Sequence, residues 1–224
     1  MVQAVEIVVE RDAEAAAAAA AALLVEAARA GGHIALAGGS TPRRAYELAA
    51  ALEPRWGKVE LWFGDERCVP PSDLRSNFRL VRDTLLDRLA RLPEHVHRIR
   101  GELGGDVAAA RYADELAPVT LDFALLGIGA DGHTASLFPG SGALADDRLA
   151  VRAEGPDVER VTLTPRALNA AQAIVFLAVG DEKREAVARA FAGESSPATP
   201  ASQIRAIART VAILDTASAG RLQS

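Results

Sequence analysis

The chain alternates between short apolar runs and longer segments whose apolar residues recur with the period of a helix. The short runs, rich in β-branched or other apolar residues, predict strands at 5–9, 33–37, 59–63, 121–128, 160–164, 173–179 and 210–214. The longer segments predict helices at 12–30, 42–52, 74–92, 106–116 and 182–191, with a short one near 202–206. Strands and helices in this alternation favour a parallel sheet covered by helices.

Several of the predicted strands lack the alternation of apolar and polar residues that is typical of a strand with one face exposed to water. The clearest is LDFALLGIG, beginning at Leu121, and such runs are typical of strands buried on both faces. We therefore predict an α/β fold with an open, doubly wound, mostly parallel sheet flanked by helices, of the Rossmann-like type. Ligands of such sheets bind beyond the carboxyl ends of the strands. The residues that follow each strand are therefore the candidates for function.

Length and composition favour a single domain over residues 1–224. Half of the 224 residues are apolar, which is enough to cover both faces of one sheet. The stretch 192–200, rich in Ser, Pro and Gly, is the only plausible linker. Only a short helix and one strand are expected after it, too little for a second domain. We expect 192–200 to be a surface loop.

The charge balance argues against nucleic acid or a membrane as a partner. The formal net charge is −5, so any positive charge that attracts an anion must be local. The alanine-rich stretch 15–25 is shorter than the roughly 20 apolar residues of a membrane span. The one cysteine, Cys68, excludes an intrachain disulfide, and no secretory leader pattern opens the chain. We expect a cytoplasmic protein.

The sequence GGSTP, from Gly38 to Pro42, lies between a predicted strand and a predicted helix. Glycines allow a phosphate to approach the backbone, and the amides at a helix start face it, with the hydroxyls of Ser40 and Thr41 as further donors. A tight turn with Ser40 or Thr41 as a simple helix cap is the alternative. The motif alone leaves both interpretations open.

Two further charged segments follow predicted strands. Asp65-Glu66-Arg67 comes after 59–63, and Arg67 would present a permanently charged fork to a phosphate or carboxylate, or else form a surface ion pair with Asp65. Lys183 lies in the predicted first turn of a helix, where a cation opposes the helix dipole unless an anion is bound. Downstream, Ser76-Asn77 is more typical of a helix cap than of a site contact.

The strongest signal is LGIGADGHTASLFP, in which a buried strand runs into glycines followed by Asp131 and His133. An imidazole titrates near neutral pH, and a nearby carboxylate can fix its tautomer, so His133 is a candidate general base. His33, His95 and His97 lack such a context and are expected to have structural or surface roles. No spacing typical of a metal site and no G-x-S-x-G elbow is present, so water is the expected nucleophile, without metal or cofactor.

Taken together, GGSTP, FGDERCVP with a later SN, LLGIGADGHTASLFPGS, RVTLT with LNAA, and GDEK resemble, in that order, the 6-phosphogluconolactonase family. The resemblance covers about residues 33–214. It implies that His133 is the general base with Asp131 as its partner, and that no cofactor is needed. It further implies a sugar-phosphate lactone as substrate and an open parallel sheet shared with glucosamine-6-phosphate deaminases. The residues that it implies for the sugar-phosphate site are Gly39, Ser40, Thr41, Arg67, Lys183 and Arg160.

Two other functions fit the sequence less well than a lactonase. Deaminases read DEY and HIAFNEP where this chain has DER and HTASLFP, so Phe138 replaces a glutamate that serves ring opening. A sugar-phosphate sensor of this fold would usually carry a basic helix-turn-helix module, for which the chain has no spare length. Some family members carry a lysine shortly before RVTLT, whereas residues 153–159 here read AEGPDVE, so that contact is not expected. A monomer is favoured, although the sequence does not determine the oligomeric state.

Overall fold

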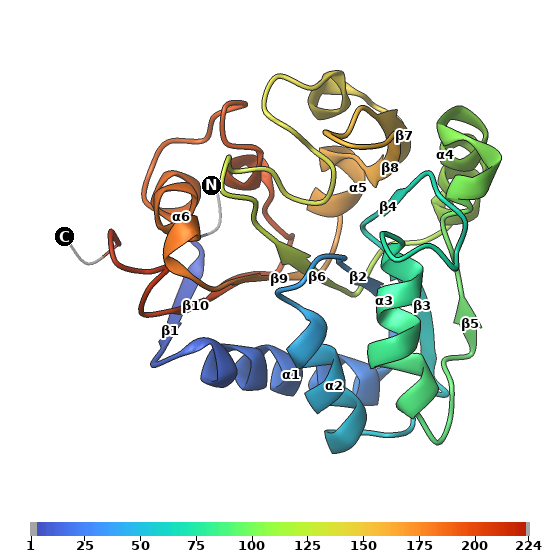
Figure 1. Cartoon of the computed structure of the whole chain (residues 1–224), viewed down its shortest axis with the longest axis horizontal. Helices are drawn as coiled ribbons and strands as arrows, with labels where there is room; N and C mark the ends of the chain where they lie inside the picture. Colours follow the sequence, from blue (N-terminus) through green and yellow to red (C-terminus); the bar gives the residue numbers. More distant parts are fainter. Residues whose placement is uncertain (1–3, 223–224) are drawn as a thin grey trace.

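The computed structural model describes residues 4–222, and its centre is a seven-stranded parallel sheet (Figure 1). The strands follow the spatial order β1-β10-β9-β6-β2-β3-β5. Their bounds are β1 Glu6–Glu10, β2 Gly32–Leu36, β3 Val59–Phe63, β5 His95–Val96, β6 Phe123–Gly127, β9 Ala173–Ala178 and β10 Arg209–Asp215. The predicted open parallel sheet is confirmed.

A second, three-stranded antiparallel sheet joins β4 (Asp65–Arg67), β8 (Arg160–Leu163) and β7 (Ala150–Ala153) in that order. The run 160–164 was predicted as part of the parallel array, and this prediction is wrong, because β8 pairs only with strands of the small sheet. All four residues of RVTL are buried, as in a central strand. Its pattern therefore predicts burial but not the strands with which it pairs.

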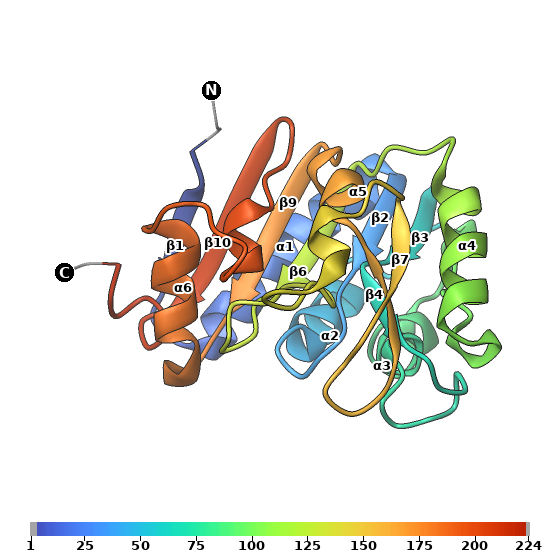
Figure 2. The same cartoon turned by 90° about the horizontal axis from the view of Figure 1, so that it is seen from above.

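Helices cover both faces of the large sheet, with α1 and α2 on one face and α5, α6 and the small sheet on the other (Figures 1 and 2). The helices are α1 Ala13–Ala30, α2 Arg43–Leu52, α3 Asn77–Thr84, α4 Gly105–Leu116, α5 Pro165–Asn169 and α6 Arg184–Phe191. Short 3₁₀ turns are η1 Leu86–Arg88, η2 Gly101–Leu103, η3 Gly142–Ala145, η4 Asp181–Lys183 and η5 Pro200–Gln203. No helix of residues 4–222 is long and apolar enough to cross a membrane.

Two predicted helices are shorter than expected. The segment 74–92 forms α3 only as far as Thr84, whose hydroxyl bonds the carbonyl of Leu80 at 2.6 Å, and Leu85 then leaves the helical conformation. Hydroxyl bonding of this kind competes with helix continuation. The short helix near 202–206 is the 3₁₀ turn η5, which begins at a proline.

Helix α1 shows why the alanine-rich segment is helical and packed. Asp12 caps its start by accepting the amide of Ala15 at 2.8 Å, and Gly31, with a φ of 85°, ends it. Ala16 and Ala20 are fully buried together with Leu24. Small side chains at these positions let the helix approach the sheet closely.

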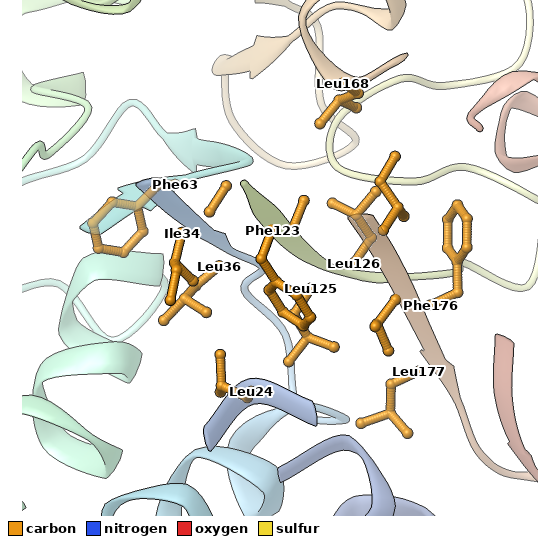
Figure 3. Close-up of a cluster of buried hydrophobic side chains, with 14 of the residues drawn as sticks. Leu24, Ile34, Leu36, Phe63, Phe123, Leu125, Leu126, Leu168, Phe176 and Leu177 are labelled. Carbon is orange, nitrogen blue, oxygen red and sulfur yellow. The ribbon is translucent and has the colours of Figure 1, made fainter. Parts of the chain in front are cut away.

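The core continues on both sides of the central strands (Figure 3). Leu125 and Leu126 are consecutive residues of β6, and at most 1% of either is exposed. Because successive side chains of a strand point to opposite faces, β6 is buried on both. Leu24 of α1 closes one side of this cluster and Leu168 of α5 the other (Figure 3).

The strand order reverses between the neighbours β2 and β6. After β2 the chain adds β3 and β5 on one side, and after β6 it adds β9 and β10 on the other. Loops leaving such a reversal diverge, which opens a crevice at the carboxyl ends of the two strands. The fold thus places a site beyond β2 and β6.

Truncating Leu125 in the central strand tests this account of the core. Leu125→Ala should lower the free energy of unfolding by about 2–5 kcal/mol, because it leaves a cavity among packed side chains. Urea denaturation followed by circular dichroism measures the change. Leu74→Ala is the matched control, since Leu74 is 84% exposed, and its effect should stay within about 0.5 kcal/mol. Equal losses in both variants would contradict the two-sided core.

Candidate active site

A cleft of about 180 Å³ opens at the carboxyl-terminal edge of the large sheet, where the loops after β2, β3, β6 and β9 meet. The predicted residues that line it are Gly39, Ser40, Thr41, Arg67, His133, Arg160 and Lys183. Asp131 adjoins the cleft through its contact with the His133 ring. The fold therefore gathers every predicted site residue, although they come from distant parts of the chain.

The turn between β2 and α2 lines the cleft at the start of a helix. Helix α2 begins after Pro42, and no side chain caps it. The hydroxyls of Ser40 and Thr41 make no hydrogen bond to another residue within 4–222, so the simple helix cap is not formed. Gly39 has a φ of 92°, and a side chain there would project into open space. Uncapped amides at a helix start favour a bound anion.

Glu66, the middle residue of DER, has a structural position. Its buried carboxylate accepts the amides of Arg67, Asn77 and Phe78 and the hydroxyl of Ser76, at distances from 2.7 to 3.0 Å. Burial raises the pKa of the Glu66 carboxyl, although these hydrogen bonds act in the opposite direction. Ser76 is also the N-cap of α3, as predicted. Glu66 thus connects β4 to the start of α3.

Two arginines face each other on the small sheet. Arg67 of β4 and Arg160 of β8 are register partners, and like charges in that position repel. The Nε of each is buried and has no hydrogen-bond partner. Arg160 bonds Asp157 at 2.9 Å and Arg67 donates to the carbonyl of Arg75, but the alternative ion pair between Arg67 and Asp65 is not formed. An anion in the cleft would offset the repulsion and satisfy the unused donors.

The loop after β6 holds His133 in a fixed orientation. One carboxylate oxygen of Asp131 accepts the His133 amide at 3.1 Å and lies 2.6 Å from ring Nδ1. An ionised carboxylate has no proton to donate and can only accept a hydrogen bond. Nδ1 therefore carries the ring proton, and Nε2 keeps a free lone pair. The neutral ring is therefore arranged to accept a proton at Nε2.

The environment of this pair keeps Asp131 ionised. Partial burial raises the pKa of the Asp131 carboxyl, but the amide, the charge and the ring of His133 together outweigh it and leave the pKa below its ordinary value. Gly129 passes close beneath the pair, since a Cβ there would lie 2.1 Å from the Nδ1 of His133. This close approach explains the glycine after the buried strand.

Phe138 lies between His133 and Arg160. Its ring centroid is 4.8 Å from that of His133, and the guanidinium carbon of Arg160 is 5.5 Å from it. Such a cation–ring contact favours one orientation of the arginine. An apolar ring at this position also adds no negative charge beside Arg160.

Lys183 reaches the cleft from the far side of the sheet reversal. It lies in η4, one residue before α6, and not in the first α-helical turn as predicted. Gly180, with a φ of 97°, allows the sharp turn from β9 into η4. Lys183 forms no ion pair with the side chains of residues 4–222, so its charge is available to a ligand.

Two polar residues of the cleft were not predicted as site residues. Asp65 and Asn77 line it together with the predicted set. A signal existed for Asp65, which follows β3 closely and so met the rule that selected Arg67. For Ser76-Asn77 the helix cap was preferred over a site contact, and the structure shows both, with Ser76 as the cap and Asn77 in the cleft.

The remaining histidines and the cysteine lie outside the cleft. His33 accepts the indole N–H of Trp62 at 3.1 Å, and His97 stacks on the same indole at 3.8 Å, which supports their predicted structural role. Burial raises the pKa of the Cys68 thiol to about 12, so it stays protonated. Within residues 4–222 no group of three His, Cys, Asp or Glu side chains could hold a metal ion.

Residues 8–213 match the family of glucosamine-6-phosphate isomerases and 6-phosphogluconolactonases. The chain belongs to this family. A family member from Streptomyces coelicolor, named 6-phosphogluconolactonase, is 36% identical and covers 97% of this chain and 94% of its own length. Another of that name, from Haemophilus influenzae, is 38% identical over 68% of this chain and 70% of its own length.

Solved structures of the family share the fold. That of 6-phosphogluconolactonase from Thermotoga maritima has a TM-score of 0.80 at 30% identity and covers 94% of this chain and 99% of its own. A monomeric glucosamine-6-phosphate deaminase has a TM-score of 0.78 at 19% identity and covers 96% of this chain and 99% of its own. Because both activities occur on this fold, the residues of the cleft must distinguish between them.

The geometry at Asp131 predicts the tautomer of His133. In the neutral ring the proton should reside on Nδ1, because that nitrogen faces the carboxylate. Nitrogen-15 NMR of histidine-labelled protein distinguishes the two ring nitrogens directly. Asp131→Ala should shift the population toward the Nε2–H form, whereas removal of the remote carboxylate in Glu10→Ala should leave it unchanged. A predominantly Nε2–H ring in the unaltered protein would contradict the arrangement.

Proposed function

We propose that this family member hydrolyses 6-phospho-D-glucono-1,5-lactone to 6-phospho-D-gluconate, a step of the oxidative pentose phosphate pathway. The observation that carries the proposal is that the His133–Asp131 pair and the opposed Arg67 and Arg160 share one cleft. A base and a strongly cationic pocket side by side suit a neutral reacting group attached to a phosphate. The relatives named 6-phosphogluconolactonase support this assignment.

In the proposed reaction His133 activates water. Its Nε2 takes a proton as the water oxygen attacks the lactone carbonyl carbon, and Asp131 stabilises the imidazolium that forms. The tetrahedral intermediate then collapses, the bond to the ring oxygen breaks, and the imidazolium returns the proton to that oxygen. Water is the only co-reactant, so the scheme requires no cofactor.

The cations and the α2 amides are assigned to the phosphate. Arg67 of β4, Arg160 of β8 and Lys183 of η4 line the cleft, and Gly39 to Thr41 contribute amides and hydroxyls. Holding the phosphate fixes the lactone carbonyl relative to Nε2 of His133, which lowers the entropic part of the barrier. The chain thus concentrates positive charge locally despite its net charge of −5.

Deamination of glucosamine 6-phosphate is the disfavoured alternative within the same family. Phe138 occupies the position where the deaminase sequences carry a glutamate, and its ring contacts His133 and Arg160. A phenyl ring can neither donate nor accept a proton for ring opening. The cleft is therefore suited to hydrolysis of a lactone rather than opening of an aminosugar.

We expect the protein to act in the cytoplasm as a monomer, on a small phosphorylated lactone and without nucleic acid or membrane partners. Every group invoked in the reaction comes from one chain, so no second copy is needed to complete the site.

Removing the base tests the proposed chemistry. The unaltered protein should accelerate hydrolysis of freshly prepared 6-phosphogluconolactone above its spontaneous rate, and His133→Ala should lower kcat by roughly 10²-fold or more. Continuous titration of the acid released measures both. His95→Ala is the matched control, because His95 is exposed and lies outside the cleft, where it contacts Glu60 and His97. Near-normal kcat in folded His133→Ala would remove this histidine from the mechanism.

Removing the phosphate tests the assignment of the cations. Plain glucono-1,5-lactone should show a kcat/KM at least about 10²-fold lower, because charge-assisted contacts worth a few kcal/mol are lost. Arg67→Ala and Lys183→Ala should weaken turnover of the phosphorylated substrate and affect the plain lactone much less. Lys58→Ala, in an exposed lysine before β3, is the control. Equal losses on both substrates would show that the residue does not contact the phosphate.

A further inference from the structure

Asp65 is a buried carboxylate in the cleft that the proposed chemistry does not use. It is 5% exposed and forms no ion pair with any residue of 4–222. Taking a carboxylate out of water is costly unless hydrogen bonds replace the lost hydration. Its Oδ2 accepts the hydroxyl of Ser136 at 2.6 Å, and its Oδ1 accepts the side-chain amide of Asn77 at 2.9 Å. Both oxygens are thus engaged by neutral donors.

One of these donors fixes the loop that carries the base. Ser136 is fully buried three residues after His133, and its amide donates to the hydroxyl of Thr162 on β8 at 3.1 Å. Ser136 is therefore held at its side chain by Asp65 and at its backbone by the small sheet. This double attachment defines where the loop ends.

The segment between these anchors and His133 is strained. Ala135 has a φ of 49°, and it is the one residue other than glycine with a positive φ in the described part of the chain. Left-handed backbone is unfavourable for a residue with a Cβ and persists only where the surroundings enforce it. The attachment of Ser136 holds one end of this turn, which is also closed by the bond from the Leu137 amide to the Thr134 carbonyl at 3.0 Å. Releasing Ser136 would let Ala135 relax toward an ordinary conformation, which would shift the loop that carries His133.

The other donor of Asp65 fixes the phosphate turn. The Asn77 amide also donates to the backbone carbonyl of Asp65 at 2.8 Å, so its orientation is set by two bonds. Its opposite face packs on Gly38, where a Cβ would lie 1.7 Å from the Asn77 Oδ1. Asn77 therefore positions the start of GGSTP.

We infer that Asp65 is a positioning residue that holds the His133 loop through Ser136 and the phosphate turn through Asn77, and so sets the distance between base and phosphate. This inference rests on the proposed lactonase function. Asp65 exchanges no proton with the substrate in this role.

Kinetic measurements separate the link from Asp65 to Ser136 from the link from Asp65 to Asn77. Ser136→Ala should lower kcat about 10-fold or more with KM within about 3-fold, because a displaced base slows the chemical step while the phosphate contacts remain. Asn77→Ala should chiefly raise KM. Thr84→Ala is the matched control, because it also deletes a buried hydroxyl bond but lies at the far end of α3. It should lower the melting temperature and leave both constants unchanged.

A double-mutant cycle tests whether Ser136 acts through Asp65. Asp65→Ala should lower kcat and raise KM together, and Ser136→Ala added to it should change kcat by less than about 2-fold. The inference is overturned if Ser136→Ala lowers kcat by its full factor in the Asp65→Ala background. It is equally overturned if folded Ser136→Ala matches the unaltered protein. Should Ser136→Ala not fold, Asp65→Ala alone decides, since a folded variant with unchanged kcat and KM excludes the role.

Failure of the proposed function is a different result. The unaltered protein would then not exceed the spontaneous rate of lactone hydrolysis. An active unaltered protein with no effect in the variants rejects only the positioning role.

Discussion

The burial of β6 on both faces is the constraint on which the site depends. Leu125 and Leu126 point in opposite directions into packed side chains, and β9 and β2 take the hydrogen bonds on either edge. A strand buried on both faces cannot carry polar catalytic side chains along its length, so such side chains can lie only at its end. The strand order reverses at the same strand, so that end is also where space opens for a ligand. The position of His133 follows from both conditions.

The second organising feature is the pair of opposed arginines on the small sheet. Arg67 and Arg160 oppose each other across the small sheet, each with a buried Nε that lacks a partner. The repulsion between the two arginines destabilises the free protein, and a bound anion would offset this repulsion. Asp157 pairs with Arg160, but Arg67 has no carboxylate partner within residues 4–222, because Asp131 is engaged by His133 and Glu66 by the amides at the start of α3.

Sequence reasoning located the parts of the site whose signals are local. Glycines beside a buried strand identified the turn at Gly39 and the loop at His133, and the Asp131 spacing predicted the contact that the structure shows. The small sheet was missed because its strands are short and β4 is charged, so pairing and not composition defines them. The link between Asp65 and Ser136 spans 71 positions, and no local pattern could indicate it.

The segment from Ile128 to Gln172 enters and leaves the large sheet at adjacent strands, β6 and β9. It contributes the base and its carboxylate partner, Phe138, Ser136 and the β8 arginine. The glycine turn after β2 and Lys183 lie outside it. The catalytic pair and one of the phosphate-binding cations assigned above therefore lie in one continuous connection between neighbouring strands. The other residues assigned to the phosphate lie elsewhere in the chain. The positions that distinguish this chain from the deaminases, Arg67 and Phe138, both lie in connections between strands of the large sheet, one outside this segment and one within it. A change of reaction can therefore be made in such connections, and the sheet and its hydrophobic layers can stay as they are.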